Sequence, residues 1–206
     1  MRFVLLVEGE TEAKVLPTFF ARWLNPQLSR KVGFREINFG GTGHFQQDYV
    51  QRTNKLLCSP AANEIVAVVG IVDLFGLKFP SSCGTLTEKY DWATRKFEKA
   101  VNHPKFRMFF AVHEIEAWIL GAPAVLPTDV RNALPKSAAN PETVNFNEPP
   151  GKLLNRLYRD KLNRRYKKTT DGTNLFRQVD PREAVEKCHY LRRALQSLLD
   201  LARGFE

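Results

Sequence analysis

The sequence has few cysteines and no long apolar run. Its three cysteines, Cys58, Cys83 and Cys188, lie far apart and form neither a CxxC pair nor a zinc-binding pattern. This favours a reducing, cytoplasmic environment over a disulfide framework. No stretch approaches the roughly 18 apolar residues that a membrane span requires. The apolar run near the N-terminus is only as long as a strand and acids follow it at once, so the sequence does not predict a signal peptide.

Acidic residues are scarce relative to basic ones. The chain of 206 residues contains 31 lysines and arginines against 22 aspartates and glutamates, which gives a net charge of +9. This excess favours a polyanionic partner such as nucleic acid over acidic proteins or metabolites. The hydrophobic content of 43% is close to the globular average, so the chain is expected to form a proper core.

Short apolar runs alternate with amphipathic segments over the first 120 residues. This alternation predicts a doubly wound, Rossmann-like α/β fold, with a mainly parallel sheet of about four strands flanked by helices. Thr11 is expected to cap the first helix, and residues 74–85 to form an ordered loop over the site. The predicted strands are 3–7, 34–39, 64–73 and 106–112, and the predicted helices are 11–23, 45–57, 86–101 and 117–120.

The character of the sequence changes after residue 122. Prolines punctuate a polar stretch with little strand pattern, residues 151–168 are very basic, and residues 181–201 have the spacing of one amphipathic helix. We therefore expect an α/β domain at residues 1–122 and a basic helical appendage, residues 123–206, packed on it.

Acidic residues stand where three predicted strands end. Glu8 follows the first strand, Asp73 ends the third, and Glu114 and Glu116 follow the fourth. The carboxyl ends of parallel strands share one edge of a sheet, where α/β proteins bind ligands, so these acids could converge. Mg²⁺ and Mn²⁺ take oxygen ligands. An acidic cluster in a basic protein suits metal-assisted attack on a phosphodiester.

The residues around these acids resemble the Toprim superfamily, whose fold is shared by topoisomerases, primases and nucleases of the overcoming-lysogenization-defect type. An apolar strand followed by Glu8-Gly9-Glu10-Thr11-Glu12 looks like the first motif of that superfamily. Ile71-Val72-Asp73 falls where the superfamily has its Asp-x-Asp motif. The resemblance covers nearly the whole chain and implies a Toprim-like fold.

Further segments resemble one small, stand-alone Toprim branch, a largely uncharacterised family of unknown function. Its members tend to be encoded beside ABC-type ATPases in bacterial defence-like loci, so the resemblance implies an ATPase partner and a role in antiphage defence. The segments that carry it are Asp73-Leu74-Phe75-Gly76 with Phe79-Pro80, His113-Glu114-Ile115-Glu116-Ala117-Trp118, and Tyr166-Lys167-Lys168 with Asp171-Gly172.

The resemblance also implies roles for individual residues. Glu8 matches a glutamate proposed as general acid/base or metal ligand, and Asp73 matches a metal ligand. Phe75 stands where the second aspartate of Asp-x-Asp is expected, so a two-metal site would need Glu114 or Glu116 in its place. Glu116 is favoured, because Glu114 could instead cap the following helix. A lysine, Lys168 or its neighbour Lys167, is expected to approach the site as a charge stabiliser.

Several other residues have both a functional and a structural interpretation. Glu12 is either part of the site or a favourable first-turn charge, and Gly9 permits a sharp turn. His113 could be a base or ligand, but a lone histidine is more often structural. The glycine-rich loop at 40–44 either holds phosphate or forms a plain turn. The basic stretch is either a solvated helix face or a phosphate-contact surface, for which the candidates are Lys152, Arg156, Arg164 and Arg165.

Three functions follow as hypotheses. The first is a Mg²⁺- or Mn²⁺-dependent phosphodiesterase that acts on nucleic acid, with Glu8, Asp73, Glu116 and Lys168 as its catalytic residues. The second is a non-catalytic subunit in which the acids are vestigial or hold one cation, while the basic appendage binds nucleic acid or an ATPase. The third is a transferase for nucleotidyl or phosphate groups on a small substrate.

Overall fold

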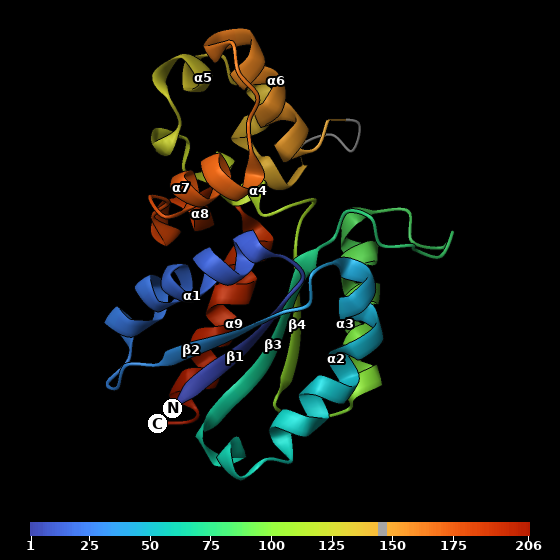
Figure 1. Cartoon of the computed structure of the whole chain (residues 1–206). Helices are drawn as coiled ribbons and strands as arrows, with labels where there is room; N and C mark the ends of the chain where they lie inside the picture. Colours follow the sequence, from blue (N-terminus) through green and yellow to red (C-terminus); the bar gives the residue numbers. More distant parts are fainter. Residues whose placement is uncertain (144–147) are drawn as a thin grey trace.

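The structure is a computed structural model that describes residues 1–143 and 148–206. In this part of the chain, four strands form one parallel sheet in the order β2-β1-β3-β4, as the alternating pattern predicts (Figure 1). The strands are β1 (Arg2–Val7), β2 (Gly33–Asn38), β3 (Ile65–Asp73) and β4 (Phe106–Ala111); the longer helices are α1 (Glu10–Leu24), α2 (Thr42–Leu57), α3 (Leu86–Val101), α6 (Pro150–Leu162) and α9 (His189–Arg203); the shorter helices are α4 (Glu116–Gly121), α5 (Thr128–Asn132), α7 (Thr173–Phe176) and α8 (Pro181–Lys187).

Helices cover both faces of the sheet. Along β1, Phe3, Leu5 and Val7 face a core that includes α1 and α9, while Val4 and Leu6 face a second core with α2 and α3. Side chains of a strand point to alternate faces, and an all-parallel sheet buries both of them. Figure 1 shows α1 and α9 on one side and α2 and α3 on the other. The predicted α/β class is confirmed.

The C-terminal helices are not all remote from the sheet. Helices α4 to α8 gather above its carboxyl edge, whereas α9 runs back along the sheet beside α1 (Figure 1). Leu195 and Leu198 of α9 belong to the same hydrophobic core as β1. The division into two domains at residue 122 stays a prediction.

Three local predictions are wrong. Helix α1 begins at Glu10 with Gly9 at its N-cap, so Thr11 does not cap it. The expected single helix at 181–201 is two helices, because Cys188 has an extended backbone between α8 and α9. The loop at 74–85 does not close over the site but projects outward past α3 (Figure 1).

The break at Cys188 is stabilised by a distant residue. Both carboxylate oxygens of Glu142 accept hydrogen bonds from backbone N–H groups in the first turn of α9, at 2.8 Å from Tyr190 and 3.1 Å from Leu191. A carboxylate at this position satisfies N–H groups that have no partner within the helix. The new helix start is therefore favoured by a contact that local periodicity does not reveal.

Within the described part of the chain, every helix is too short or too polar to cross a membrane.

Candidate functional site

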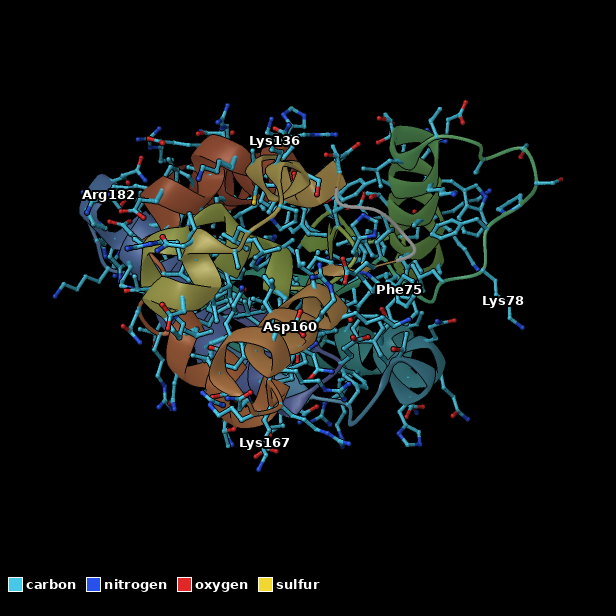
Figure 2. The ribbon with its side chains drawn as sticks, turned by 90° about the horizontal axis from the view of Figure 1, so that it is seen from above. Phe75, Lys78, Lys136, Asp160, Lys167 and Arg182 are labelled. Atoms are coloured by element: carbon cyan, nitrogen blue, oxygen red, sulfur yellow. The ribbon has the colours of Figure 1, made fainter. Side chains whose placement is uncertain are left out.

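Four carboxyl groups meet at the carboxyl edge of the sheet, the edge that Figure 2 views from above. Glu8 follows β1, Asp73 ends β3, Glu12 lies in the first turn of α1 and Glu116 begins α4. Glu12, Asp73 and Glu116 are 2%, 9% and 1% exposed, while Glu8 is half-buried. We call these four residues the acidic cluster. Parallel register aligns the strand ends, with Val7 beside Ile71 and Asp73 beside Ala111.

The ammonium group of Lys168 stands within the acidic cluster. Its Nζ lies 3.1 Å from Glu12 Oε1, 3.4 Å from Asp73 Oδ2 and 3.6 Å from Glu116 Oε2. Lys168 begins a turn of π-helix, Lys168–Gly172, between α6 and α7. A residue from the basic C-terminal region thus supplies the counter-charge to acids from the sheet.

Neighbouring contacts fix the turn that carries Lys168. The Tyr166 hydroxyl donates to Glu116 Oε1 at 3.4 Å. Asp171 accepts the backbone N–H of Lys167 at 2.8 Å and pairs through both oxygens with Arg164 Nη1 at 2.9 Å. The segment before and after Lys168 is therefore bonded, and its ammonium is held in the cluster.

Burial sets the protonation of these groups. It raises the pKa of Asp73 well above the usual range and also raises the pKa of Glu116, because a low dielectric disfavours the charged carboxylate. Burial alone would lower the pKa of Lys168, but the carboxylates of Asp73, Glu116 and Glu12 outweigh it and the pKa is raised. One cation therefore faces an excess of carboxyl groups, and the cluster favours a further proton or cation.

Glu8 is positioned by the glycine-rich loop. Its Oε2 accepts a hydrogen bond from the Thr42 hydroxyl at 2.7 Å, and Thr42 begins α2 after Gly40 and Gly41, which have φ values of 73° and 143°. Burial raises the pKa of Glu8, partly offset by the bond from Thr42. The contact shown here orients an acid. Whether the loop also contacts phosphate stays a prediction.

A hollow of about 510 Å³ opens beside Glu8. Its walls are the turn from Glu8 to Glu12, the Gly40–Thr42 loop, Asn38, Lys168 and Thr169. A Cβ atom on Gly9 would stand 2.5 Å from Glu12 Oε2, so a larger residue there would force the Glu12 carboxylate to shift. The Glu-Gly-x-Thr-Glu pattern thus has a steric reason in this chain.

Other predicted site residues lie outside the acidic cluster. Glu114 Oε2 accepts the backbone N–H of Gly151 at 2.8 Å, which ties the end of β4 to the start of α6 rather than adding a carboxylate to the cluster. His113 is buried, has φ of 65°, and burial lowers its pKa. Phe75 donates its N–H to the His113 carbonyl at 3.2 Å. The side chain of Lys167 is exposed.

The predicted phosphate contacts are all exposed. Lys152 and Arg156 lie on α6, and Arg164 and Arg165 follow it. Arg156 pairs with Glu148 and Asp160, while Arg164 pairs with Asp171 and lies over the Tyr158 ring at 4.8 Å. Half of this set therefore already has an acidic partner, and a polyanion would compete with it.

The donors of the acidic cluster have the chemistry of a site for a hard divalent cation. Asp73 Oδ1 is buried and accepts no hydrogen bond within the described residues, and carboxylate oxygens are what Mg²⁺ and Mn²⁺ bind. Across residues 1–143 and 148–206, however, no three Asp, Glu, His or Cys side chains have the spacing to hold an ion. The Lys168 ammonium stands among three of these carboxylates.

Sequence reasoning underrated Glu12. The burial of Glu12 could have been predicted from helical spacing, because Glu12 lies on the same face of α1 as the buried residues Val15, Leu16 and Phe19. A charged residue on a buried stripe needs a partner. The partner, Lys168, lies 156 positions later in the chain, and no local pattern connects the two.

Comparison with known proteins places the chain in a family. Residues 7–199 match the family described as "Domain of unknown function (DUF4276)". The chain belongs to the DUF4276 family. The match spans the whole acidic cluster and Lys168. No curated protein matches the chain.

Two solved structures are similar to this DUF4276 chain. One is the C-terminal region of the Burkholderia pseudomallei OLD protein, with 18% identity and a TM-score of 0.47, covering 97% of this chain and 98% of that one. The other is the C-terminal region of the Xanthomonas campestris pv. campestris OLD protein, with 22% identity and a TM-score of 0.45, covering 98% of this chain and 95% of that one.

Proposed function

We propose that this protein is a Mg²⁺- or Mn²⁺-dependent phosphodiesterase that acts on nucleic acid, a Toprim-like nuclease. The supporting observation is the convergence of Glu8, Glu12, Asp73 and Glu116 at the carboxyl edge of a parallel sheet, which is where open α/β folds bind ligands. The net charge of +9 and the exposed cations on and after α6 suit a polyanionic substrate.

Each residue has a role in this proposal. Asp73 and Glu116 would hold the metal ion, with Glu8 or Glu12 as a further ligand. When bound, the ion would lower the pKa of a bound water and neutralise charge on the phosphate. Glu8 would accept the proton of the attacking water at Oε1, the oxygen that Thr42 does not engage. Its raised pKa suits a general base near neutral pH.

Lys168 would stabilise charge on the phosphate. In the present arrangement its ammonium neutralises the acids. With Asp73 and Glu116 holding a divalent cation, the Lys168 ammonium would be available to a phosphate oxygen on the side of the hollow that Lys168 lines.

Cleavage assays test this proposal directly. Labelled single- and double-stranded DNA and RNA are incubated with Mg²⁺, Mn²⁺ or EDTA. We expect metal-dependent cleavage, and Glu8→Gln should slow it by roughly 100-fold or more, the lower range for loss of a general base. Asp73→Asn and Glu116→Gln should abolish it. Glu183→Gln is the control, because Glu183 is exposed on α8 and does not line the hollow. Cleavage that survives Glu8→Gln and Asp73→Asn would contradict the proposal.

Two observations favour a second candidate, a non-catalytic subunit. Phe75 replaces an expected aspartate, and no three acids in the described residues are spaced for an ion. The acids and Lys168 would then form a structural ion-pair network, while the basic surface docks nucleic acid or an ABC-type ATPase. Calorimetric titration with Mn²⁺ separates the candidates. The nuclease should bind Mn²⁺ and lose binding in Asp73→Asn, whereas the subunit should bind nucleic acid without it.

The cellular setting is also a proposal. The resemblance to a branch encoded beside ABC-type ATPases supports a role as the effector of a defence-type module. Co-expression with an ABC-type ATPase from a locus of this kind, followed by affinity purification, would test it. A stable complex whose nuclease activity exceeds that of the isolated chain is the expected result.

A further inference from the structure

One aromatic side chain at the carboxyl edge of the sheet is left in solvent. Phe75 is 43% exposed and is the only large hydrophobic residue in the described part of the chain that is exposed. Single exposed hydrophobic residues are ordinary on protein surfaces, so the exposure alone does not indicate a function. The position of Phe75 does, because Phe75 follows Asp73 of the acidic cluster by two residues and their Cα atoms are at most about 7 Å apart.

The backbone holds Phe75 at this edge. Leu74 donates its N–H to the Ala111 carbonyl at 2.8 Å and Phe75 donates to the His113 carbonyl at 3.2 Å, so pairing with the β4 side continues past the end of β3. Gly76, with φ of 92°, then turns the chain away. Phe75 therefore lies two residues past the end of β3, where these bonds hold the backbone at the base of the projecting loop (Figure 2).

The rest of the loop shows what a structural aromatic does here. The Phe79 ring packs edge-on against Trp92, with ring centroids 5.8 Å apart, and the Lys89 ammonium lies over it at 5.9 Å. Leu74 is buried at 4% exposure. These side chains anchor the loop, whereas burial of Phe75 contributes little to the fold.

Two lysines belong to this loop and to the helix that follows it. Lys78 is exposed on the same loop and points away from the body of the protein (Figure 2), and Lys89 lies at the start of α3. An exposed aromatic ring with basic groups nearby is the combination that binds single-stranded nucleic acid, because every base has a face that can stack while the backbone phosphates meet the cations.

We infer that Phe75 stacks on an unpaired base next to the phosphodiester held at the acidic cluster, and that the protein therefore prefers single-stranded nucleic acid. This inference rests on the proposed function, since it uses the same edge of the sheet. In a duplex the base faces are covered by their neighbours, so the ring has nothing to stack on. Stacking tolerates any base, so the preference concerns strandedness and not sequence.

Binding measurements with cleavage-resistant strands test the inference. The probes are phosphorothioate-linked oligonucleotides that carry one 2-aminopurine, single-stranded or as a duplex, in Mg²⁺. Wild type should bind the single strand more tightly and quench the 2-aminopurine. Phe75→Ala should weaken single-strand binding by roughly 5- to 150-fold, the range for one stacked base, and abolish the quenching while duplex binding is unchanged. Phe75→Trp should restore both.

Phe205→Ala is the matched control. Phe205 lies near the C-terminus, at the opposite edge of the sheet, where the Lys105 ammonium is 5.4 Å from its ring. The Phe205→Ala variant should bind single strands as wild type does. Circular dichroism and urea unfolding of each variant separate lost stacking from lost folding.

The outcomes distinguish this inference from the proposed function. If Phe75→Ala keeps the ratio of single-strand to duplex binding while Asp73→Asn still abolishes cleavage, the inference is wrong and the nuclease stands. Wild type that binds no single strand also overturns it. So does a Phe75→Ala variant that binds strands normally but no longer co-purifies with an ATPase, since Phe75 would then contact a protein partner.

Discussion

The acidic cluster and the basic surface on and after α6 differ in how their charges are stabilised. In the acidic cluster, buried carboxyl groups share one ammonium, that of Lys168. On and after α6, exposed cations such as Arg156 and Arg164 pair with acids in contact with water. A buried charge that loses its partner is costly, whereas an exposed pair is worth little. Substitutions in the two regions should therefore differ in kind.

The largest expected loss of stability comes from removing the ammonium group in the acidic cluster. Lys168→Met keeps the aliphatic stem but removes the ammonium, so Glu12, Asp73 and Glu116 lose their counter-charge. We expect the free energy of unfolding at pH 7 to fall by about 3 kcal/mol, the lower end for breaking a buried pair, because Lys168 is partly exposed. Urea unfolding measures this. Lys167→Met, at an exposed neighbour, should change stability by no more than about 0.5 kcal/mol.

Acid and divalent cations should rescue Lys168→Met. Because the pKa values of Asp73 and Glu116 are raised, the folded variant binds more protons than the unfolded chain, and its stability rises as pH falls. Mg²⁺ should stabilise it as well, since a ligand that binds the folded state shifts the equilibrium toward it. Equal losses in Lys168→Met and Lys167→Met would show that the cluster needs no counter-charge.

Glu142 is a buried carboxylate outside the acidic cluster, and it is stabilised by backbone N–H groups rather than by an ammonium. It therefore extends the comparison. Burial raises the pKa of Glu142 from 4.5 to about 7, so between these values the folded state binds more protons than the unfolded one. Stability should therefore fall as pH rises from about 4.5 to 7, by up to about 3 kcal/mol.

Urea unfolding of wild type and Glu142→Gln across this pH range isolates the contribution of Glu142. The difference in unfolding free energy between the two should change with pH in the stated direction, since Gln does not titrate. A difference that is constant from pH 4.5 to 7 would show that the N–H groups of Tyr190 and Leu191 keep Glu142 ionised in the folded protein.

The smallest expected effect on stability is at the exposed cations. Lys152→Gln and Arg165→Gln should each change the unfolding free energy by less than about 0.5 kcal/mol. Each should still weaken nucleic-acid binding and make the slope of log K against log salt less negative by about 0.7 to 0.9. Arg203→Gln, at an exposed arginine in the last turn of α9, is the control. An unchanged slope in both variants would place the phosphate contacts elsewhere.

The strands and the long helices were predictable because their patterns are local. The apolar runs that become β1, β3 and β4 are readable within ten residues, and Leu86–Val101 is found as predicted. An acidic residue stands at or just after the end of each of these three strands, and parallel pairing then places Glu8 and Asp73 at one edge. The break at Cys188 was not predictable, because the Glu142 contact that favours it crosses 48 positions.

The choice between Glu114 and Glu116 shows the same limit. Both follow β4 with the spacing of side chains on one strand face, and sequence reasoning preferred Glu116 only because Glu114 could cap the helix that follows. That reason is wrong, because no side chain in the described part of the chain caps α4. The structure places Glu116 beside Lys168, while Glu114 accepts the N–H of Gly151 at the start of α6. Helix contacts at the end of a strand decide which of two near-identical acids enters the cluster.

The sequence by itself determined the α/β class, the order of the strands' acidic ends and the excess of positive charge, because strand and helix periodicity and charge are properties of neighbouring residues. Only the tertiary structure decided that Glu12 joins the cluster, that Lys168 rather than its neighbour Lys167 supplies its counter-charge, and that Phe75 stays in solvent beside it. The first two outcomes depend on where a chain segment more than 150 residues from Glu12 packs, which no pattern among neighbouring residues specifies.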